Sequence, residues 1–195
     1  MKKLTFRPYV LGVTGSASSG KDSVANYLVK KYNFKKITLS NYLRQEAIKR
    51  GKNCSRKSLR KLQAQLRKEY GDEYLISKII NTILVKDHLR MKNVVIVGLR
   101  TQAETKLAKE KLKLKLIFVD AGPFIRYKRA KSRRRGGFAK TYEQFLHEEA
   151  LENAIFDFHK TKKMANFKVD NSGTIKDMQR QINKITKKLK LKKRK

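Results

Sequence analysis

The stretch GSASSGKDS (15–23) constrains the fold more than any other part of the sequence. It places Gly15 and Gly20 five positions apart, and Lys21 follows directly. Glycines at this spacing let the backbone wrap a phosphate with successive N–H groups, and the lysine ammonium can reach the terminal phosphates of a nucleotide. Such a loop needs a strand before it and a helix after it, because the helix N-terminus also points at the phosphate.

The sequence on both sides of the loop has that pattern. YVLGVT (9–14) is short and apolar, as a buried strand should be, and VANYLVKKY (24–32) places Val24, Leu28 and Tyr32 on or near one helical face. The plainer alternative is a glycine-rich turn that holds no ligand. Spacing, lysine and context together favour a phosphate-binding loop.

Short apolar runs alternate with helical patterns along the rest of the chain. NVVIVGL (93–99) is the clearest strand, because it has consecutive β-branched residues bounded by Asn93 and Gly98. Alternation of this kind predicts an α/β fold of three layers, with a parallel sheet between two layers of helices. We predict strands at 9–14, 34–40, 93–99, 114–121 and 166–171, and helices at 24–32, 41–50 (capped by Ser40), 56–70, 74–89, 101–112, from Pro123 onward, 141–162 and after Gly173.

The chain has neither an internal repeat nor a linker rich in Pro, Gly and Ser, so we expect one domain over residues 1–186. The helical region 41–90 and the region 131–150 lengthen two crossovers, and we expect both to project from the sheet as flaps. With 39% hydrophobic residues the chain can bury a core, and it has no apolar run long enough to cross a bilayer. Cys54 has no partner for a disulfide or metal site, and the N-terminus lacks the pattern of a signal peptide, so we expect a cytoplasmic protein without membrane contact.

The net charge is +34, from 50 Lys and Arg against 16 Asp and Glu. Such a charge attracts polyanions, although most of these residues are expected simply to solvate exposed helix faces. The tail KKLKLKKRK (187–195) concentrates the charge. We expect this tail to be frayed at its end and to hold RNA weakly.

The residue after Lys21 is Asp22, where the usual phosphate-loop pattern has Ser or Thr. In this the loop resembles those of the nucleoside monophosphate kinase and dephospho-CoA kinase family, in which the hydroxyl falls one position later. The resemblance implies a P-loop NTPase fold with a five-stranded parallel sheet, and ATP and Mg²⁺ as cofactors. It implies Ser23 and Asp22 as the metal positions, and nucleotide contacts from Gly15, Ser16, Ala17, Ser18, Ser19, Gly20, Lys21, Asp22 and Ser23.

Two further segments resemble the acceptor side of the same family. ITLSNYLRQEA is similar to the segment after the second strand and VVIVGLRTQAE to the segment after the third. The resemblance implies that Arg44 and Arg100 bind the acceptor phosphate, with 41–90 as the acceptor-binding region. Val97 departs from the pattern, because many relatives have an aspartate there that orients magnesium. Asp22 and Asp120 are the candidates for a substitute.

VDAGPFIRYKRAKSRRR resembles the strand, helix and arginine-rich lid of the same family, which implies a lid over about 131–150. The resemblance implies Lys21, Arg126, Arg129 and Arg133 as catalytic residues, because phosphoryl transfer needs cations that neutralise the charge on the transferring group. Arg135 is a further arginine of the same lid segment. Arg126 and Arg129 share a helical face and are expected to point at one phosphate site. Gly136 and Gly137 are hinge candidates, and Glu148 and Glu149 are expected to pair with lid arginines.

VDNSGTIKDM resembles the loop beside the adenine, which assigns Asn171 and Gly173 to the nucleotide.

The resemblance implies an ATP-dependent phosphotransferase that moves the γ-phosphate of ATP to a small phosphorylated acceptor, with a nucleoside monophosphate as the first candidate. Dephospho-CoA is the second candidate for the acceptor. A different class stays open, a catalytically weak ATP-binding protein with a basic surface for nucleic acid. We expect a monomer or a homodimer.

Overall fold

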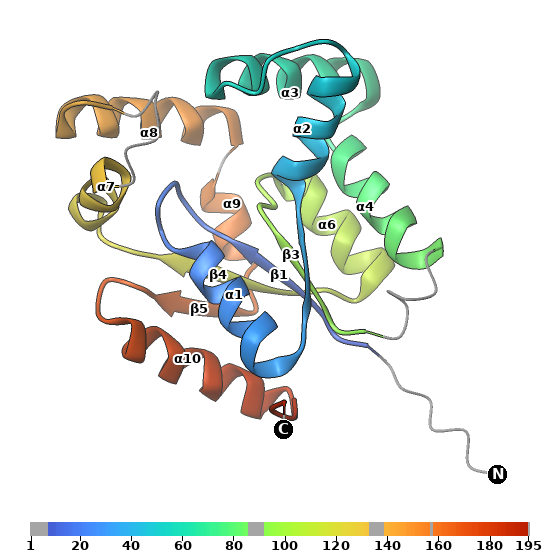
Figure 1. The fold of residues 1–195 in the computed structure, drawn as a ribbon, viewed down its shortest axis with the longest axis vertical. Coiled ribbons are helices and arrows are strands. Elements are labelled where there is room, and N and C mark those ends of the chain that lie inside the picture. Colours follow the sequence, from blue (N-terminus) through green and yellow to red (C-terminus); the bar gives the residue numbers. More distant parts are fainter. Residues whose placement is uncertain (1–7, 86–91, 133–138, 157, 195) are drawn as a thin grey trace.

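The computed structural model describes residues 8–85, 92–132, 139–156 and 158–194. Its centre is a five-stranded sheet in the order β2-β3-β1-β4-β5 (Figure 1). The strands are β1 (Val10–Thr14), β2 (Lys35–Thr38), β3 (Val94–Val97), β4 (Lys115–Asp120) and β5 (Phe167–Asp170), and every neighbouring pair is parallel. The predicted α/β fold with a five-stranded parallel sheet is confirmed.

Successive strand residues point to opposite faces of the sheet, and each face has its own core. Val94 and Ile96 of β3 pack into one buried cluster, whereas Val95 and Val97 pack into the other. Both faces are apolar because helices cover both, which explains why the strands read as continuous hydrophobic runs.

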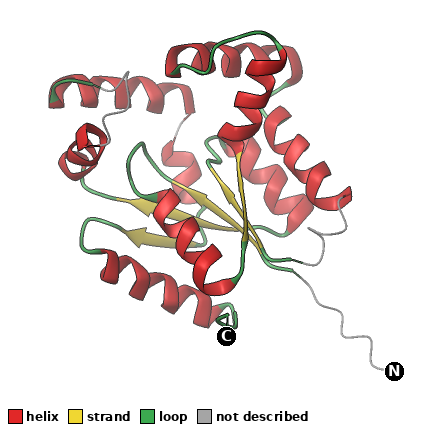
Figure 2. Cartoon of the chain, in the orientation of Figure 1, coloured by secondary structure: helices red, strands yellow, loops and turns green. Residues whose placement is uncertain are grey.

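The helices divide between the two faces. α1 (Lys21–Tyr32) and α10 (Ile175–Lys188) cover one face, and α2 (Leu39–Lys49), α3 (Arg56–Tyr70), α4 (Tyr74–Val85) and α6 (Gln102–Leu112) contribute to the core of the other. After β4 come α7 (Pro123–Ser132), α8 (Tyr142–Phe156) and α9 (Phe158–Lys163). Figure 2 shows α2 and α3 on one side, and α7 and α8 on the other, standing beyond the carboxyl ends of the strands. Within the described residues, no helix is long and apolar enough to span a membrane.

The predicted cap of the second helix is wrong. α2 begins at Leu39, with Thr38 as its N-cap and without a side-chain cap hydrogen bond, so Ser40 lies inside the first turn. The helix starts early because β2 ends at Thr38 and the chain turns directly from strand to helix. The predicted helix 74–89 is described as α4 over Tyr74–Val85, and residues 86–89 lie outside the described part of the chain.

The basic tail does not fray over its described residues. The amide of Lys190 donates to Lys187 O at 3.0 Å and that of Leu191 to Thr186 O at 2.9 Å, while Lys190 has a positive φ of 52°. This is the double hydrogen bond of a Schellman motif, which turns the chain back at the end of α10. The amide of Arg194 then donates to Lys31 O at 2.8 Å, so the tail is held against the end of α1.

Candidate functional site

The loop between β1 and α1 has the backbone conformation that its glycines were expected to allow. Gly15 has a φ of +147° and Gly20 a φ of +94°. A Cβ at Gly15 would lie 2.1 Å from Val119 O, so a side chain there would collide with the neighbouring strand. Ser18 is also left-handed, with a φ of 58°, and Lys21 Nζ donates to Ser16 O at 3.3 Å across the loop. The loop is therefore a tight turn that lies directly on β4.

The first turn of α1 has no side-chain cap. Its N-cap is Gly20, which has no side chain to accept a hydrogen bond, whereas α3, α6 and α10 are capped by the side chains of Ser55, Thr101 and Thr174. The first amides of a helix have no acceptor within the helix, and an anion can supply one. Nucleotide phosphates thus fit this loop, which combines a helix start without a side-chain cap, a positive dipole end and the Lys21 ammonium.

Asn171, from the turn after β5, braces this loop. Its side-chain Nδ2 donates to Ser19 O at 2.8 Å, and its backbone amide donates to Asp120 O at 2.7 Å. A Cβ at Gly20 would lie 2.0 Å from Asn171 Nδ2, so the second glycine of the loop is required by this contact. Gly173, two residues further, lies in the turn before α10 next to Asp177, where a Cβ would meet its carboxylate at 2.9 Å.

The structure separates the two described lid arginines. Arg129 lies beside the phosphate loop and donates to Asn171 O at 2.8 Å. Arg126 is 5% exposed and is fully engaged elsewhere, because its Nε donates to Ala121 O at 2.8 Å and both terminal nitrogens donate to Glu149. The expectation that both point at one phosphate site is therefore not met. The expected pairing of the acidic residues with lid arginines is present as the Arg126–Glu149 contact.

The remaining predicted lid residues lie outside the described part of the chain. These are Arg133, Arg135, Gly136 and Gly137. Their assigned roles stay predictions.

The carboxylates considered for magnesium are both ion-paired. Asp22 lies 2.7 Å from Lys36 Nζ and Asp120 lies 2.6 Å from Lys162 Nζ. Val97 is 1% exposed and packs in the core shared with α1. Across the residues that the structure describes, no group of three His, Cys, Asp or Glu side chains could hold a metal. Magnesium commonly keeps waters and substrate phosphates as ligands, so the exposed Ser23 hydroxyl would be the protein's contribution.

Arg44 and Arg100, the residues assigned to the acceptor, have different surroundings. Arg44 is exposed on α2, whereas Arg100 follows β3 and is half-buried. The Arg100 guanidinium lies 4.9 Å from the centre of the Phe156 ring, and Arg67 of α3 lies 4.7 Å from the same ring. The end of α8 thus covers two cations, one from α3 and one from the segment after β3.

Sequence reasoning missed Arg67, Phe156 and Glu104, the acid that contacts both Arg67 and the backbone of Arg100. Glu104 is 1% exposed, accepts the Arg100 amide at 2.7 Å, and lies 3.5 Å from a terminal nitrogen of Arg67. Burial raises the pKa of Glu104, while the nearby hydrogen bonds and arginines oppose that shift. The sequence carries a signal for this acid, since TQAE has the spacing of a capping box, which Thr101 and Glu104 form.

A cavity of about 620 Å³ opens beside the carboxyl ends of β4 and β5. Phe118, Asp120, Gly122, Arg126, Lys162 and Ser172 contribute to its lining. Ser172 follows the bracing Asn171, and Gly122 precedes α7, so the cavity lies between the turn after β5 and the start of α7.

Known proteins resemble this chain in sequence and in fold. A family model described as an AAA domain matches residues 14–146. A UPF0200 protein of Methanocaldococcus jannaschii is 29% identical over 177 residues, covering 90% of this chain and 88% of the relative. A UPF0200 protein of Methanococcus vannielii is 26% identical over 180 residues, covering 92% of this chain and 96% of the relative.

The similar solved structures include small-molecule kinases. A shikimate kinase from Acinetobacter baumannii in complex with shikimate has a TM-score of 0.61 at 13% identity, covering 97% of this chain and 99% of that one. A gluconokinase from Sinorhizobium meliloti has a TM-score of 0.57 at 14% identity, covering 95% and 97%. At such low identity these likenesses establish the fold, which is that of the P-loop kinases.

Proposed function

The chain belongs to the AAA domain family, and from this premise we propose that it is an ATP-dependent phosphotransferase that moves the γ-phosphate to a small anionic acceptor. The observation that carries the proposal is the uncapped N-terminus of α1, which directs its first amides toward a loop closed by Gly15 and Gly20. A phosphate is the ligand that completes such a site.

In the proposed reaction, the loop amides and Lys21 hold the β- and γ-phosphates and neutralise the charge that spreads over the transferring group. Arg129 lies next to the same loop and would add a second cation. The magnesium ion, when bound, would neutralise phosphate charge and would be held through the Ser23 hydroxyl. Arg126 is instead a positioning residue, since its guanidinium holds α8 to α7 through Glu149.

We propose a nucleoside monophosphate as the acceptor. Arg100 and Arg44 lie after β3 and on α2, on the side of the loop away from the lid, and guanidinium groups suit a phosphate monoester because they can bind it with two hydrogen bonds. Of the two kinases named above, one is a shikimate kinase and the other a gluconokinase. This fold therefore accommodates small acceptors. Dephospho-CoA is the alternative acceptor, which also carries an anionic group.

The competing class, a catalytically weak ATP-binding protein, is favoured by one specific observation. The position where an aspartate was expected is the buried Val97, and both nearby carboxylates are ion-paired with lysines. Such a protein would bind ATP through the loop and turn it over slowly.

The deciding experiment measures ADP release from Mg²⁺–ATP with a panel of nucleoside monophosphates, dephospho-CoA, shikimate and gluconate. We expect one nucleoside monophosphate to stimulate release and to yield the diphosphate. Stimulation by dephospho-CoA alone would select the alternative acceptor. Slow release that no acceptor stimulates would instead support the weak ATP-binding protein.

Lys21→Ala supplies the control for the loop, and Lys30→Ala supplies the matched control on the same helix. We expect Lys21→Ala to abolish turnover with little change in the free energy of unfolding, and Lys30→Ala to leave both unchanged. Full turnover by Lys21→Ala would remove the loop from the mechanism.

A further inference from the structure

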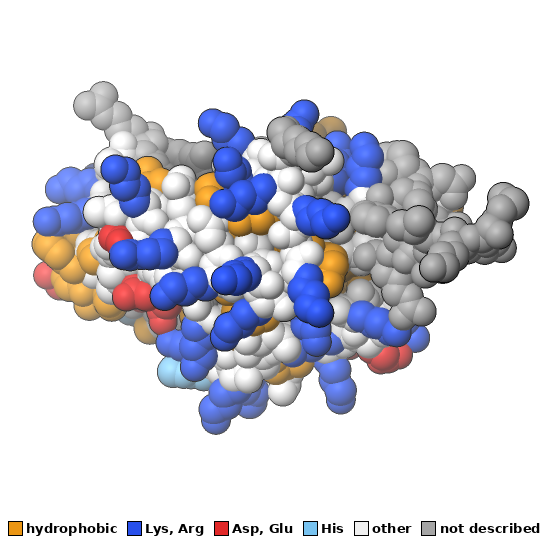
Figure 3. All heavy atoms as spheres, turned by 90° about the horizontal axis from the view of Figure 1, so that it is seen from below, with side chains coloured by type: hydrophobic (Ala, Val, Ile, Leu, Met, Phe, Trp, Pro, Cys, Tyr) orange, Lys and Arg blue, Asp and Glu red, His pale blue; other side chains and the backbone are white. Residues whose placement is uncertain are grey.

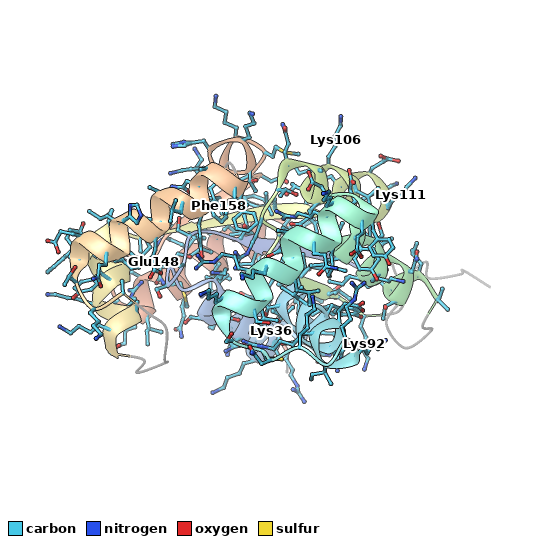
Figure 4. The ribbon with its side chains drawn as sticks, turned by 90° about the horizontal axis from the view of Figure 1, so that it is seen from above. Lys36, Lys92, Lys106, Lys111, Glu148 and Phe158 are labelled. Carbon is cyan, nitrogen blue, oxygen red and sulfur yellow. The ribbon has the colours of Figure 1, made fainter. Side chains whose placement is uncertain are left out.

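The end of the molecule opposite the phosphate loop is lined with exposed cations. All strands are parallel, so their amino ends share one edge, and α1, α6 and α10 run back toward that edge. Figure 4 shows Lys92 and Lys111 at this end and Glu148 of α8 at the other. We call this surface the basic end; its exposed members are Lys30, Lys31, Lys35, Lys92, Lys111, Lys113, Lys115, Lys187, Lys188, Lys190, Lys192, Lys193 and Arg194.

Carboxylates are nearly absent from the same region. Among the described strand starts, the last turns of α1, α6 and α10, and the tail, Glu110 is the one acidic residue, and it pairs with Lys111 at 2.9 Å. At the other end, Asp22, Asp120 and Asp177 each lie in an ion pair. Seen from below, the face that carries α10 shows many Lys and Arg side chains and few acidic ones (Figure 3).

Helix dipoles explain only part of this arrangement. Lys30, Lys31, Lys187 and Lys188 lie in the last turns of α1 and α10, where a cation stabilises the helix. That reason does not apply to the lysines at the starts of β2 and β4, nor to those beyond the end of α10. Their like charges repel one another, and so their gathering on one end costs stability.

The tail is fixed in place at the basic end. The Schellman motif at Lys190 reverses the chain, and Leu189 and Leu191 pack against the core that α1 and α10 share. The hydrogen bond from the Arg194 amide to Lys31 O joins the two groups of cations. A ligand that meets this surface therefore does not have to order the tail, which lowers the entropic cost of binding.

We propose that the basic end binds nucleic acid through its phosphodiester backbone. Many exposed cations gathered at one end of the molecule suit a row of phosphates, since each contact releases a condensed counterion. Tyr9, which is 38% exposed, is the one exposed aromatic ring at this end in the described residues, so the surface offers a single ring for base stacking and binding depends on the phosphates. Binding is thus independent of base sequence, and it leaves the phosphate loop at the other end open to ATP.

The test is fluorescence anisotropy with a labelled RNA of about 20 nucleotides, and with DNA of the same sequence, at salt concentrations between about 50 and 200 mM. The variant replaces Lys187, Lys190, Lys192 and Lys193 by Gln and keeps both leucines that anchor the tail. The charge-matched control replaces Lys49, Lys57, Lys61 and Lys68 by Gln, which are exposed lysines of α2 and α3.

We expect the tail variant to bind RNA at least about 10-fold more weakly at about 100 mM salt and to lower the slope of log affinity against log salt by about 3. The control should change affinity by less than about 3-fold, and both variants should keep the ATP affinity of the parent. RNA and DNA should bind within a few-fold of each other, as a backbone contact requires.

Three results would overturn the proposal. The first is no saturable binding of either nucleic acid at the lowest salt, and the second is equal weakening by the tail and control variants, which would reduce the effect to net charge. The third is displacement of RNA by poly-glutamate at an equal concentration of negative charge, which would show that the surface takes an acidic polypeptide instead.

Discussion

The side-chain amide of Asn171 donates a 2.8 Å hydrogen bond to the backbone carbonyl of Ser19, and so joins the turn after the last strand to the phosphate loop. The same residue accepts a hydrogen bond from Arg129 on its backbone carbonyl. The loop, the lid helix α7 and the edge strand β5 are thus connected through one residue.

Asn171→Ala should weaken ATP binding even under conditions in which the variant is fully folded. The change removes the brace on Ser19 O and should lower the free energy of unfolding by about 1–2 kcal/mol. Calorimetry with Mg²⁺–ATP should show at least a 10-fold rise in Kd. Asn183→Ala is the matched control, because Asn183 accepts hydrogen bonds from Tyr27 and Tyr32 away from the loop. Equal Kd values for the two variants would contradict the bracing role.

Ser23→Ala and Asp22→Asn should separate the two predicted metal positions. We expect Ser23→Ala to raise the Mg²⁺ concentration needed for half-maximal turnover by several-fold, because it removes the hydroxyl that would hold the ion. Asp22→Asn should leave that concentration unchanged, since Asp22 is paired with Lys36. A magnesium titration of ADP release measures both, and a larger effect from Asp22→Asn would reverse the assignment.

Arg126→Ala should act mainly on stability. It leaves the carboxylate of Glu149 without its partner, and breaking a buried pair in this way costs about 3–5 kcal/mol. The double variant Arg126→Ala with Glu149→Ala should be less destabilised than the two single changes added together. Urea unfolding of the four proteins measures this coupling, and simple additivity would argue against the pair as the clamp between α7 and α8.

The free energy of unfolding of Glu104→Gln, compared with that of the parent protein, should increase as pH rises. Burial raises the pKa of Glu104 above its ordinary value of 4.5, so the unfolded chain loses this proton before the folded protein does. The contribution of this group to stability is therefore full below about pH 4.5 and is lost as pH rises through the folded pKa. Urea unfolding at several pH values should show the free energy of unfolding of Glu104→Gln gaining on the parent across that window.

The exposed Glu110→Gln is the control for the same series. Lys111 lowers the pKa of Glu110, and so this variant should show no such gain as pH rises. A constant difference between Glu104→Gln and the parent at every pH would show that Glu104 does not titrate differently in the two states.

The order and type of the elements were predictable because the sequence patterns and the fold agree. Both faces of the sheet are covered, so Val94, Val95, Ile96 and Val97 are all buried and the strand reads as one apolar run. The glycine spacing of the phosphate loop likewise has a local cause, the positive φ angles of Gly15 and Gly20.

The surroundings of the site were not predictable, since they depend on contacts between distant segments. Arg126 and Arg129 share a helical face, yet Arg126 binds Glu149 and Arg129 binds the backbone of Asn171. Phe156 meets Arg67 and Arg100 across the fold, and no spacing in the sequence indicates such a cluster. The tail looked like an unstructured run of charge, because its two anchoring leucines are hidden among lysines.

The strand order has a consequence for how two reactants meet. β1 is the central strand, with β3 on one side and β4 on the other, and the helices that follow β2 and β4 therefore flank its carboxyl end from opposite directions. In the proposed reaction, donor and acceptor can thus be bound at the same time, because each reaches the site from a different side of β1. Such an arrangement suits a ternary complex with direct transfer, and steady-state kinetics should give intersecting rather than parallel double-reciprocal lines.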